Sequence, residues 1–174
     1  CLRKLILQYH IQLLVVCETR ANCMLAETFR QKIHFDYVVY NTFGSIWLFY
    51  NDPFNLVLVG KGEQHFFILA RHSSFPTSLT VSFAHALCKG EERRALWSAP
   101  MRDKPLHEPW FVGGDFNVVV DAGEKEGGRP FRLSEALVFL DSMSSAEWCD
   151  AGCVGSLYIG RYYRLGRASI WKFV

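Results

Sequence analysis

The feature that most constrains the fold is a series of short apolar runs that follow one another along the chain with few helical segments between them. Each run is rich in β-branched and aromatic residues and is bounded by turn residues, which is typical of strands. The runs occupy residues 12–18, 35–41, 44–52, 55–60, 64–70, 78–86, 109–115, 156–163 and 168–174. This order does not fit a simple βαβ winding, and it favours a sandwich of two mixed, largely antiparallel sheets with helices outside.

Helical spacing of apolar residues is limited to four segments, at 1–9, 24–32, 90–99 and 134–145. In the third segment Leu96 and Trp97 are expected to face inward, and in the fourth Ser134 is a suitable N-cap residue. A polar, Gly-rich loop is expected at 122–131. Because no internal repeat or low-complexity linker separates these elements, we expect a single domain over residues 1–174.

The charge of the chain is uneven along its length. The net charge of +2 is too small for the whole chain to be a polyanion binder. After Asp150, however, the sequence contains basic residues and no acid, and they alternate with aromatic residues in "YIGRYYRLGR". Such a segment could contact nucleic-acid phosphates and stack on bases, or it could be an exposed hairpin with solvated side chains. The candidate nucleic-acid contacts are Arg161, Arg164, Arg167 and Lys172.

The cysteines favour an intracellular protein, nuclear or cytoplasmic. Six cysteines are scattered along the chain without a CxxC pair, and Cys149 and Cys153 have no Cys/His pair at zinc spacing. We therefore expect free thiols, several of them buried, in a reducing compartment. No apolar stretch is long enough to span a membrane, and the first residues do not resemble a signal peptide.

Polar residues at the end of the run at 109–115 mark the strongest candidate site. Asp115 and Asn117 are two residues apart, so in an extended segment they point to the same side while Phe116 points back. Gly113 and Gly114 allow a close approach of backbone or substrate. An acid can orient or deprotonate a water molecule there, and an amide can hold a phosphate oxygen. The same pattern is also that of an Asx-turn that leaves a strand, and the residues alone leave both interpretations open.

Two further strand ends carry groups that could take part in catalysis. Glu18 ends the run at 12–18, where a carboxylate can hold a hard cation, although a strand-end acid often faces water or pairs with a neighbour such as Arg20. His85 lies near the end of the run at 78–86. Its imidazole could hydrogen-bond a phosphate or bind a metal, but a single histidine without a partner pattern is more often structural.

These pieces, taken in order, resemble one family. The segments "LLVVCETR", "GSIWLFYND", "SFAHALCKGEERRALW", "WFVGGDFNVVVDAGEKEGGRPFRLSEALVFLD" and "GRASIWK" are similar to the endonuclease/exonuclease/phosphatase superfamily. The likeness is strongest to the endonuclease domain of plant LINE-type (non-LTR) retrotransposons. It runs through nearly the whole chain in collinear order, and it is most specific between Gly113 and Asp141.

The resemblance implies a four-layered α/β (α+β) sandwich and Mg²⁺-dependent cleavage of phosphodiester bonds in DNA. It implies that Glu18 is a metal ligand and that Asp115 and Asn117 position the attacking water and the phosphate. Where this chain has His85, members of the family commonly have a Tyr after the strand. His85 would therefore take the place of that Tyr.

The family pattern also contains features that this sequence does not match. Members begin with an Asn-bearing strand before the first helix, and they carry a late Asp and a Ser-Asp-His motif after the "IWK" stretch. We therefore expect an incomplete sandwich that lacks the first strand and the C-terminal strands, with little or no catalysis. One alternative is an active phosphoesterase on small phosphates, which would need a histidine near Asp115 from His65, His72 or His107. The other is a non-enzymatic nucleic-acid-binding remnant.

Overall fold

The computed structural model describes residues 2–124 and 130–150, and within them it contains helices and strands at the positions that the sequence predicts. The helices are α1 (Leu2–Gln8), α2 (Ala26–Ile33), α3 (Gly90–Asp103) and α4 (Leu133–Ala146), with 3₁₀ turns η1 (Cys23–Leu25) and η2 (Ala122–Glu124). The strands are β1 (Leu13–Cys17), β2 (Tyr37–Tyr40), β3 (Ile46–Tyr50), β4 (Asn55–Lys61), β5 (His65–Arg71), β6 (Leu79–His85) and β7 (Trp110–Asp115). The strands expected at 156–163 and 168–174 lie outside the described residues.

The strands form two sheets. One has the order β1-β3-β2 and is antiparallel throughout. The other has the order β4-β5-β6-β7, in which β6 and β7 are parallel and the remaining pairs are antiparallel. The parallel pair follows from the crossover through α3, because parallel neighbours cannot be joined by a hairpin. The carboxyl ends of β6 and β7 consequently lie at the same edge of the sheet.

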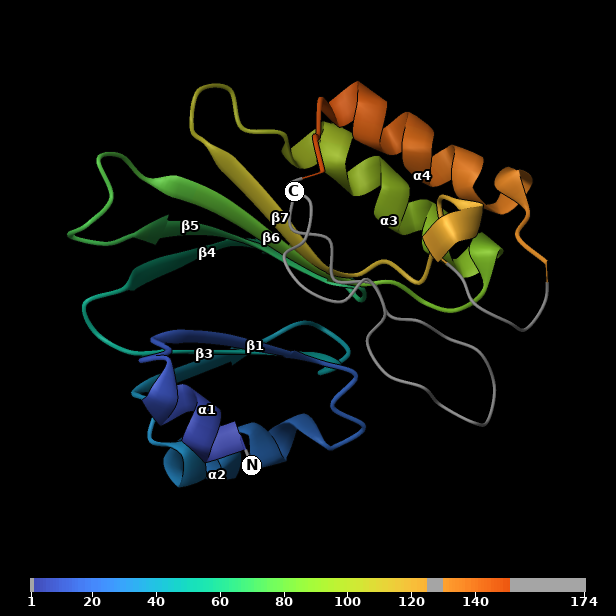
Figure 1. Ribbon diagram of the computed structural model, residues 1–174. Helices are drawn as coiled ribbons and strands as arrows, with labels where there is room; N and C mark the ends of the chain where they lie inside the picture. The colour runs from blue at the N-terminus through green and yellow to red at the C-terminus, as the bar shows by residue number, and fades with distance from the viewer. Residues whose placement is uncertain (1, 125–129, 151–174) are drawn as a thin grey trace.

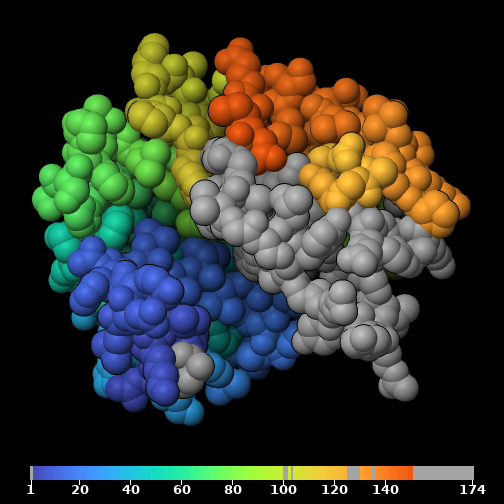
Figure 2. All heavy atoms as spheres, viewed as in Figure 1, coloured from blue at the N-terminus to red at the C-terminus, as the bar shows by residue number. Residues whose placement is uncertain are grey.

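The two sheets pack face to face, and each has helices on its outer face. Helices α1 and α2 cover the β1-β3-β2 sheet, and α3 and α4 cover the β4-β5-β6-β7 sheet (Figure 1). The same order of layers is visible in the space-filling view, from the blue N-terminal helices at the bottom to orange α4 at the top (Figure 2). The predicted four-layered α+β sandwich with mostly antiparallel sheets is confirmed.

Alternation along β3 shows how the sequence builds these layers. Ile46 and Leu48 point into the cluster between the sheets, whereas Trp47 and Phe49 point into the cluster beneath α1 and α2. Residues i and i+2 of a strand share a face, so a strand buried on both faces is apolar at every position. This is why the run at 44–52 shows no polar alternation.

Helix ends depend on contacts that the local sequence does not predict. The expected N-cap at Ser134 is wrong: α4 begins one residue earlier, at Leu133, and the preceding residue, Arg132, makes no side-chain cap hydrogen bond. Ser134 therefore lies within the first helical turn. A residue that precedes a helix can accept hydrogen bonds from the free backbone amides of the first turn, and Ser134 is not in that position.

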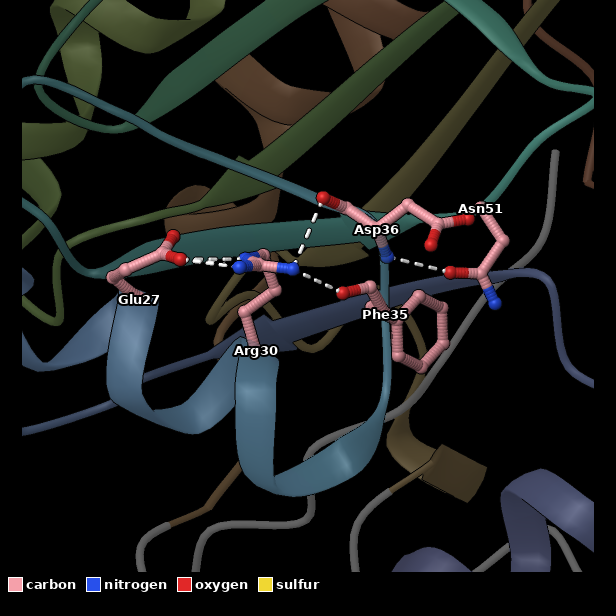
Figure 3. A network of polar contacts seen from close by, with 5 residues as sticks. All are labelled: Glu27, Arg30, Phe35, Asp36 and Asn51. Carbon is pink, nitrogen blue, oxygen red and sulfur yellow. Dashed lines mark hydrogen bonds and ion pairs between the residues drawn. The ribbon is translucent and has the colours of Figure 1, made fainter.

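The turn between α2 and β2 is held by Arg30 (Figure 3). Its guanidinium forms two bonds to Glu27, of 2.8 and 2.5 Å, and donates to the carbonyls of Phe35 and Asp36 at 2.6 and 3.1 Å. The amide of Asp36 in turn donates to Oδ1 of Asn51 at 2.8 Å. Asn51 directly follows Tyr50, the last residue of β3, which pairs with both Leu13 of β1 and Tyr37 of β2. The network therefore holds one end of this sheet, and Cys17 lies at the opposite end.

Candidate functional site

The candidate site is the end of the sandwich at which β1, β6 and β7 all terminate. His85 and Asp115, the last residues of β6 and β7, are partners in the parallel register. Cys17, the last residue of β1, lies across the two sheets from them, with its Sγ 4.0 Å from the carbonyl oxygen of Ala84. The structure thus brings together three strand ends that are 30 or more residues apart in the sequence.

Asp115 and Asn117 form one tightly held loop. Oδ1 of Asp115 accepts the amide of Asn117 at 2.9 Å, which is the Asx-turn bond that the sequence leaves open. The side-chain Nδ2 of Asn117 donates to the carbonyl of Ala86 at 2.6 Å, and the amide of Ala86 donates to the carbonyl of Asp115 at 2.7 Å. Asn117 has a φ of +49°, in the left-handed region. Backbone strain of this kind is concentrated at functional sites when the surrounding contacts impose it.

The expected alternation across this loop is present for Phe116. This side chain is buried among the residues beneath α3 and α4, together with Trp97 and Phe139. Asp115 lies close enough to Cys17 to act on its thiol through both its carboxylate and its backbone amide. Phe116 therefore anchors the loop while Asp115 stays at the end of the two sheets.

Glu18 follows β1 directly, but its carboxylate is engaged with Arg20. The Arg20 Nη2 atom lies 2.6 Å from Oε1 of Glu18, and the side chains are 81% and 54% exposed, respectively. Both residues have positive φ values, +54° for Glu18 and +45° for Arg20. The pairing with Arg20 is the non-catalytic alternative considered from the sequence, and the role of Glu18 as a metal ligand stays a prediction.

Of the candidate histidines, His85 and His65 lie at this end of the sheet. The backbone amide of His85 donates to the carbonyl of Gln64 at 2.8 Å, and His65 pairs with Ala84. The ring of His65 lines a small cavity beneath α3 and α4, on the helix side of the sheet. His72 follows the opposite end of β5, and His107 precedes the first residue of β7, so both lie at the far end of the sheet.

One residue of the site was missed from the sequence, Arg93 on the first turns of α3. It is 6% exposed, and its Nη1 atom donates to the carbonyl of Asn117. The signal is available in the sequence, since Arg93 precedes Leu96 and Trp97 by three and four residues and so shares their inward face. A buried arginine is expensive unless it is paired, and here its bond to Asn117 ties α3 to the loop.

Two buried amides, also missed from the sequence, hold neighbouring turns at this end. Gln64 accepts the amide of Leu87 and donates to the carbonyl of Glu92, both at 2.8 Å. Asn41 donates to the carbonyl of Glu63 at 2.6 Å and accepts the amide of Ile46 at 3.0 Å. The turn between β4 and β5 is thereby bonded both to α3 and to the β1-β3-β2 sheet.

The thiol of Cys17 is strongly perturbed by its position. The pKa of Cys17 is raised from 9.0 to about 12: burial is the main cause, the Asp115 carboxylate adds to the rise, and a hydrogen bond from the backbone of Asp115 offsets part of it. The thiol is therefore protonated at neutral pH, and it is a packing group between the sheets rather than a nucleophile.

This pKa predicts an alkaline loss of stability. Above about pH 9 the unfolded chain releases the Cys17 proton while the folded chain keeps it, so the free energy of unfolding falls as the pH rises towards about 12. The expected slope from this group is about 1 kcal/mol per pH unit. Because Tyr and Lys side chains also titrate there, the measurement is the difference between the wild-type protein and Cys17→Ala in urea unfolding at pH 8 to 11. Parallel pH profiles for the two proteins would contradict the placement of Cys17.

A Mg²⁺ ion usually keeps several waters and takes only one or two carboxylates from the protein. Within residues 2–124 and 130–150, no group of three or more His, Cys, Asp or Glu side chains is arranged to hold a metal ion. Mg²⁺ needs oxygen ligands in near-octahedral geometry, and the expected ligand Glu18 is bonded to Arg20. Dependence on Mg²⁺ stays a prediction.

Two predictions concern other parts of the molecule. The candidate nucleic-acid contacts lie outside the described residues, namely Arg161, Arg164, Arg167 and Lys172. In the described part of the chain, none of the helices has the length and apolarity needed to cross a membrane. The described cysteines are free, as expected, but Cys17 and Cys23 are only half-buried and the expected burial is wrong for Cys88 and Cys149, which are exposed.

Comparison with known proteins shows the fold of the chain. No family model and no curated protein matches the sequence. Among solved structures, the endonuclease domain of TRAS1, a telomere-specific non-LTR retrotransposon, matches with a TM-score of 0.67 and 8% identity, over 99% of this chain and 75% of that domain. The beta toxin of Staphylococcus aureus matches with a TM-score of 0.55 and 13% identity, over 93% of this chain and 72% of the toxin.

A third match, the catalytic domain of human Nocturnin, is more distant. Its TM-score is 0.39 at 18% identity, over 68% of this chain and 56% of that domain. At such identities the likeness concerns the fold and not the activity. The four layers, the strand order and the likeness to the TRAS1 domain together show that this chain has the endonuclease/exonuclease/phosphatase-type fold.

Proposed function

We propose that this chain is a retroelement endonuclease-like domain of the LINE type, whose ancestral substrate was DNA, and that it cleaves DNA poorly or not at all. The observation that carries the proposal is the Asp115–Asn117 loop, which ends β7 beside the ends of β1 and β6. The fold of the TRAS1 endonuclease domain and the collinear sequence motifs support the assignment to this type.

In such a site each polar group of the loop has a defined task. The Asp115 carboxylate would orient or deprotonate the attacking water, and the Asn117 amide would bond an oxygen of the phosphate. His85, next to Asp115 in the register, would donate to the same phosphate. The backbone strain at Asn117, the hydrogen bond from the Ala86 amide to the Asp115 carbonyl and the bond from Arg93 to the Asn117 carbonyl would fix the loop before substrate binds.

The proposed weakness of catalysis is supported by the bonds that these groups already make. Oδ1 of Asp115 is bonded to an amide, Nδ2 of Asn117 is bonded to a carbonyl, and Glu18 is paired with Arg20. In-line attack on a phosphodiester needs an activated water, a cation and donors to the developing charge. A substrate or cation would have to displace these internal bonds to use the same atoms.

The test is nicking of supercoiled plasmid in the presence of Mg²⁺, with wild-type protein and Asp115→Ala. We expect the wild-type rate to be no higher than that of Asp115→Ala. The matched control is Asp121→Ala, because Asp121 lies in the same loop and also accepts an amide two residues on, at 2.7 Å from Gly123. Rapid nicking that is lost in Asp115→Ala and kept in Asp121→Ala would overturn the proposed inactivity and would show that Asp115 is required.

A further inference from the structure

A polar cavity of about 140 Å³ lies on the α3 side of the Asp115–Asn117 loop. Its walls include Cys88 from the segment before α3, Arg93 from the start of α3, Asn117 from the loop, and Arg132 from the segment before α4. A single water needs only about 10–15 Å³ of such volume. The cavity is therefore large enough for several waters or for one tetrahedral oxyanion.

The charges at this cavity favour an anion. Arg93 is almost fully buried and is held in place by its bond to the carbonyl of Asn117, so its guanidinium forms a fixed part of the wall. Arg132 is exposed and can move towards a ligand. The cavity also faces the amino-terminal turn of α3, where the helix dipole is positive.

Two acidic residues of neighbouring segments, Glu92 and Glu124, make bonds within the protein. The Glu92 carboxylate pairs with Lys89 at 3.1 Å, and Oε2 of Glu124 accepts the amide of Val120 at 2.9 Å. Arginine suits phosphate better than other anions of the same charge, because its planar fork matches two phosphate oxygens. Arg93 and Arg132 thus give this cavity, whose other walls include Val118, Val119, Pro130 and Phe131, two side chains suited to a phosphate.

We propose that this cavity binds a phosphate group adjacent to the one that the Asp115–Asn117 loop would hold. The inference rests on the proposed function and deepens it: two neighbouring phosphate positions fit a nucleic-acid strand and not a small molecule with one phosphate. Asn117 is shared by both positions, since it belongs to the loop and lines the cavity. Inorganic phosphate and a phosphate of a DNA strand present the same oxygens to the arginines. The experiment therefore has one arm for each of these two ligands.

The first arm is a titration of the isotope-labelled chain with inorganic phosphate, followed by amide chemical shifts. We expect the shifts to be concentrated at Cys88, Arg93, Asn117 and Arg132. We expect affinity to fall about tenfold in Arg93→Met and several-fold in Arg132→Met, because the buried Arg93 is held in place whereas the exposed Arg132 must be ordered to contact the ligand. Shifts that fall elsewhere, or wild-type protein that binds no phosphate, would overturn the proposal.

Matched variants separate the site from general charge and from folding. Arg94 is the next residue of α3 and is exposed, so Arg94→Met makes the same change outside the cavity and should leave phosphate affinity unchanged. Arg93→Lys keeps the charge and should recover part of the affinity. If Arg93→Met does not fold, the comparison of Arg132→Met with Arg94→Met tests the proposal, because both residues are exposed. Equal phosphate affinities of these two variants would contradict the site.

The second arm measures binding of a short DNA duplex as a function of salt. Removal of one phosphate contact should lower the slope of log affinity against log salt by about one unit, and we expect this in Arg132→Met but not in Arg94→Met. Phosphate binding without this change would overturn the assignment to a nucleic-acid strand. Asp115-dependent plasmid nicking would overturn the proposed lack of cleavage and would leave both binding results unaffected.

Discussion

Gly114→Ala is expected to destabilise the protein by more than about 3 kcal/mol, or to prevent folding. Gly114 has a φ of +141°, and a Cβ atom there would lie 1.9 Å from the carbonyl oxygen of Ala84 and 2.8 Å from its carbonyl carbon and nitrogen. The obstructing atoms are main chain of the paired strand β6, so they cannot turn away as a flexible side chain would. Because whole domains are stable by only about 5–15 kcal/mol, the loss is a large part of the total.

Gly60→Ala is the matched control for this prediction. A Cβ atom at Gly60 would have no atom within 4 Å, and the residue does not have a positive φ in the left-handed range. We expect its free energy of unfolding to stay within about 1 kcal/mol of the wild-type value. The measurement is urea unfolding followed by circular dichroism. A Gly114→Ala protein as stable as Gly60→Ala would contradict the β6–β7 register that places Asp115 at the site.

Asn41→Ala is expected to lower the free energy of unfolding by about 2–4 kcal/mol. Asn41 is completely buried, and its side chain accepts the amide of Ile46 while donating to the carbonyl of Glu63 and to the hydroxyl of Ser45. Alanine would leave the buried amide of Ile46 without its acceptor and the part-buried carbonyl of Glu63 without its donor. The cost is that of leaving the groups unsatisfied, which exceeds the net value of a hydrogen bond.

Two variants test this explanation. Asn41→Asp keeps the acceptor for Ile46 but places a carboxylate against the carbonyl of Glu63, so we expect it to be at least as harmful as alanine. Asn51→Ala is the matched control, because Asn51 is half-buried and its side chain accepts one amide, that of Asp36, at 2.8 Å. It should cost about 1 kcal/mol. Equal losses in Asn41→Ala and Asn51→Ala would show that the bonds of Asn41 do not join the two sheets.

The secondary structure and the placement of helices outside the sheets could be predicted from the sequence, because they depend on how apolar residues repeat over a few neighbouring positions. The run at 44–52 is apolar on both faces, and β3 is buried on both faces. Leu96 and Trp97 face inward from α3 as their spacing predicts. The start of α4 was predicted less well, since the first turn depends on the conformation of the residues before it and not on one favourable cap residue.

The candidate residues Glu18, His85, Asp115 and Asn117 were chosen from strand-end positions and from family resemblance, and their catalytic roles stay predictions. Sequence reasoning could place them at the ends of strands but could not say which bonds they make. The Asx-turn bond of Asp115 and the ion pair of Glu18 with Arg20 were both open alternatives, and both are present. The sequence analysis does not single out Arg93, because its partner, Asn117, is 24 residues away in the sequence.

Within the described residues, the sequence by itself determined the order of strands and helices, the inward faces of α3 and β3, and the polar loop that ends β7. Each of these follows from residues within one or two turns of helix or a few residues of strand. Only the tertiary structure decided that Arg93 is buried against the Asn117 loop, that Cys17 lies beside Asp115, and that Asn41 joins the two sheets. The physical reason is that a hydrogen bond or a shifted pKa depends on distance in space, and segments far apart in the chain meet only once the layers have packed.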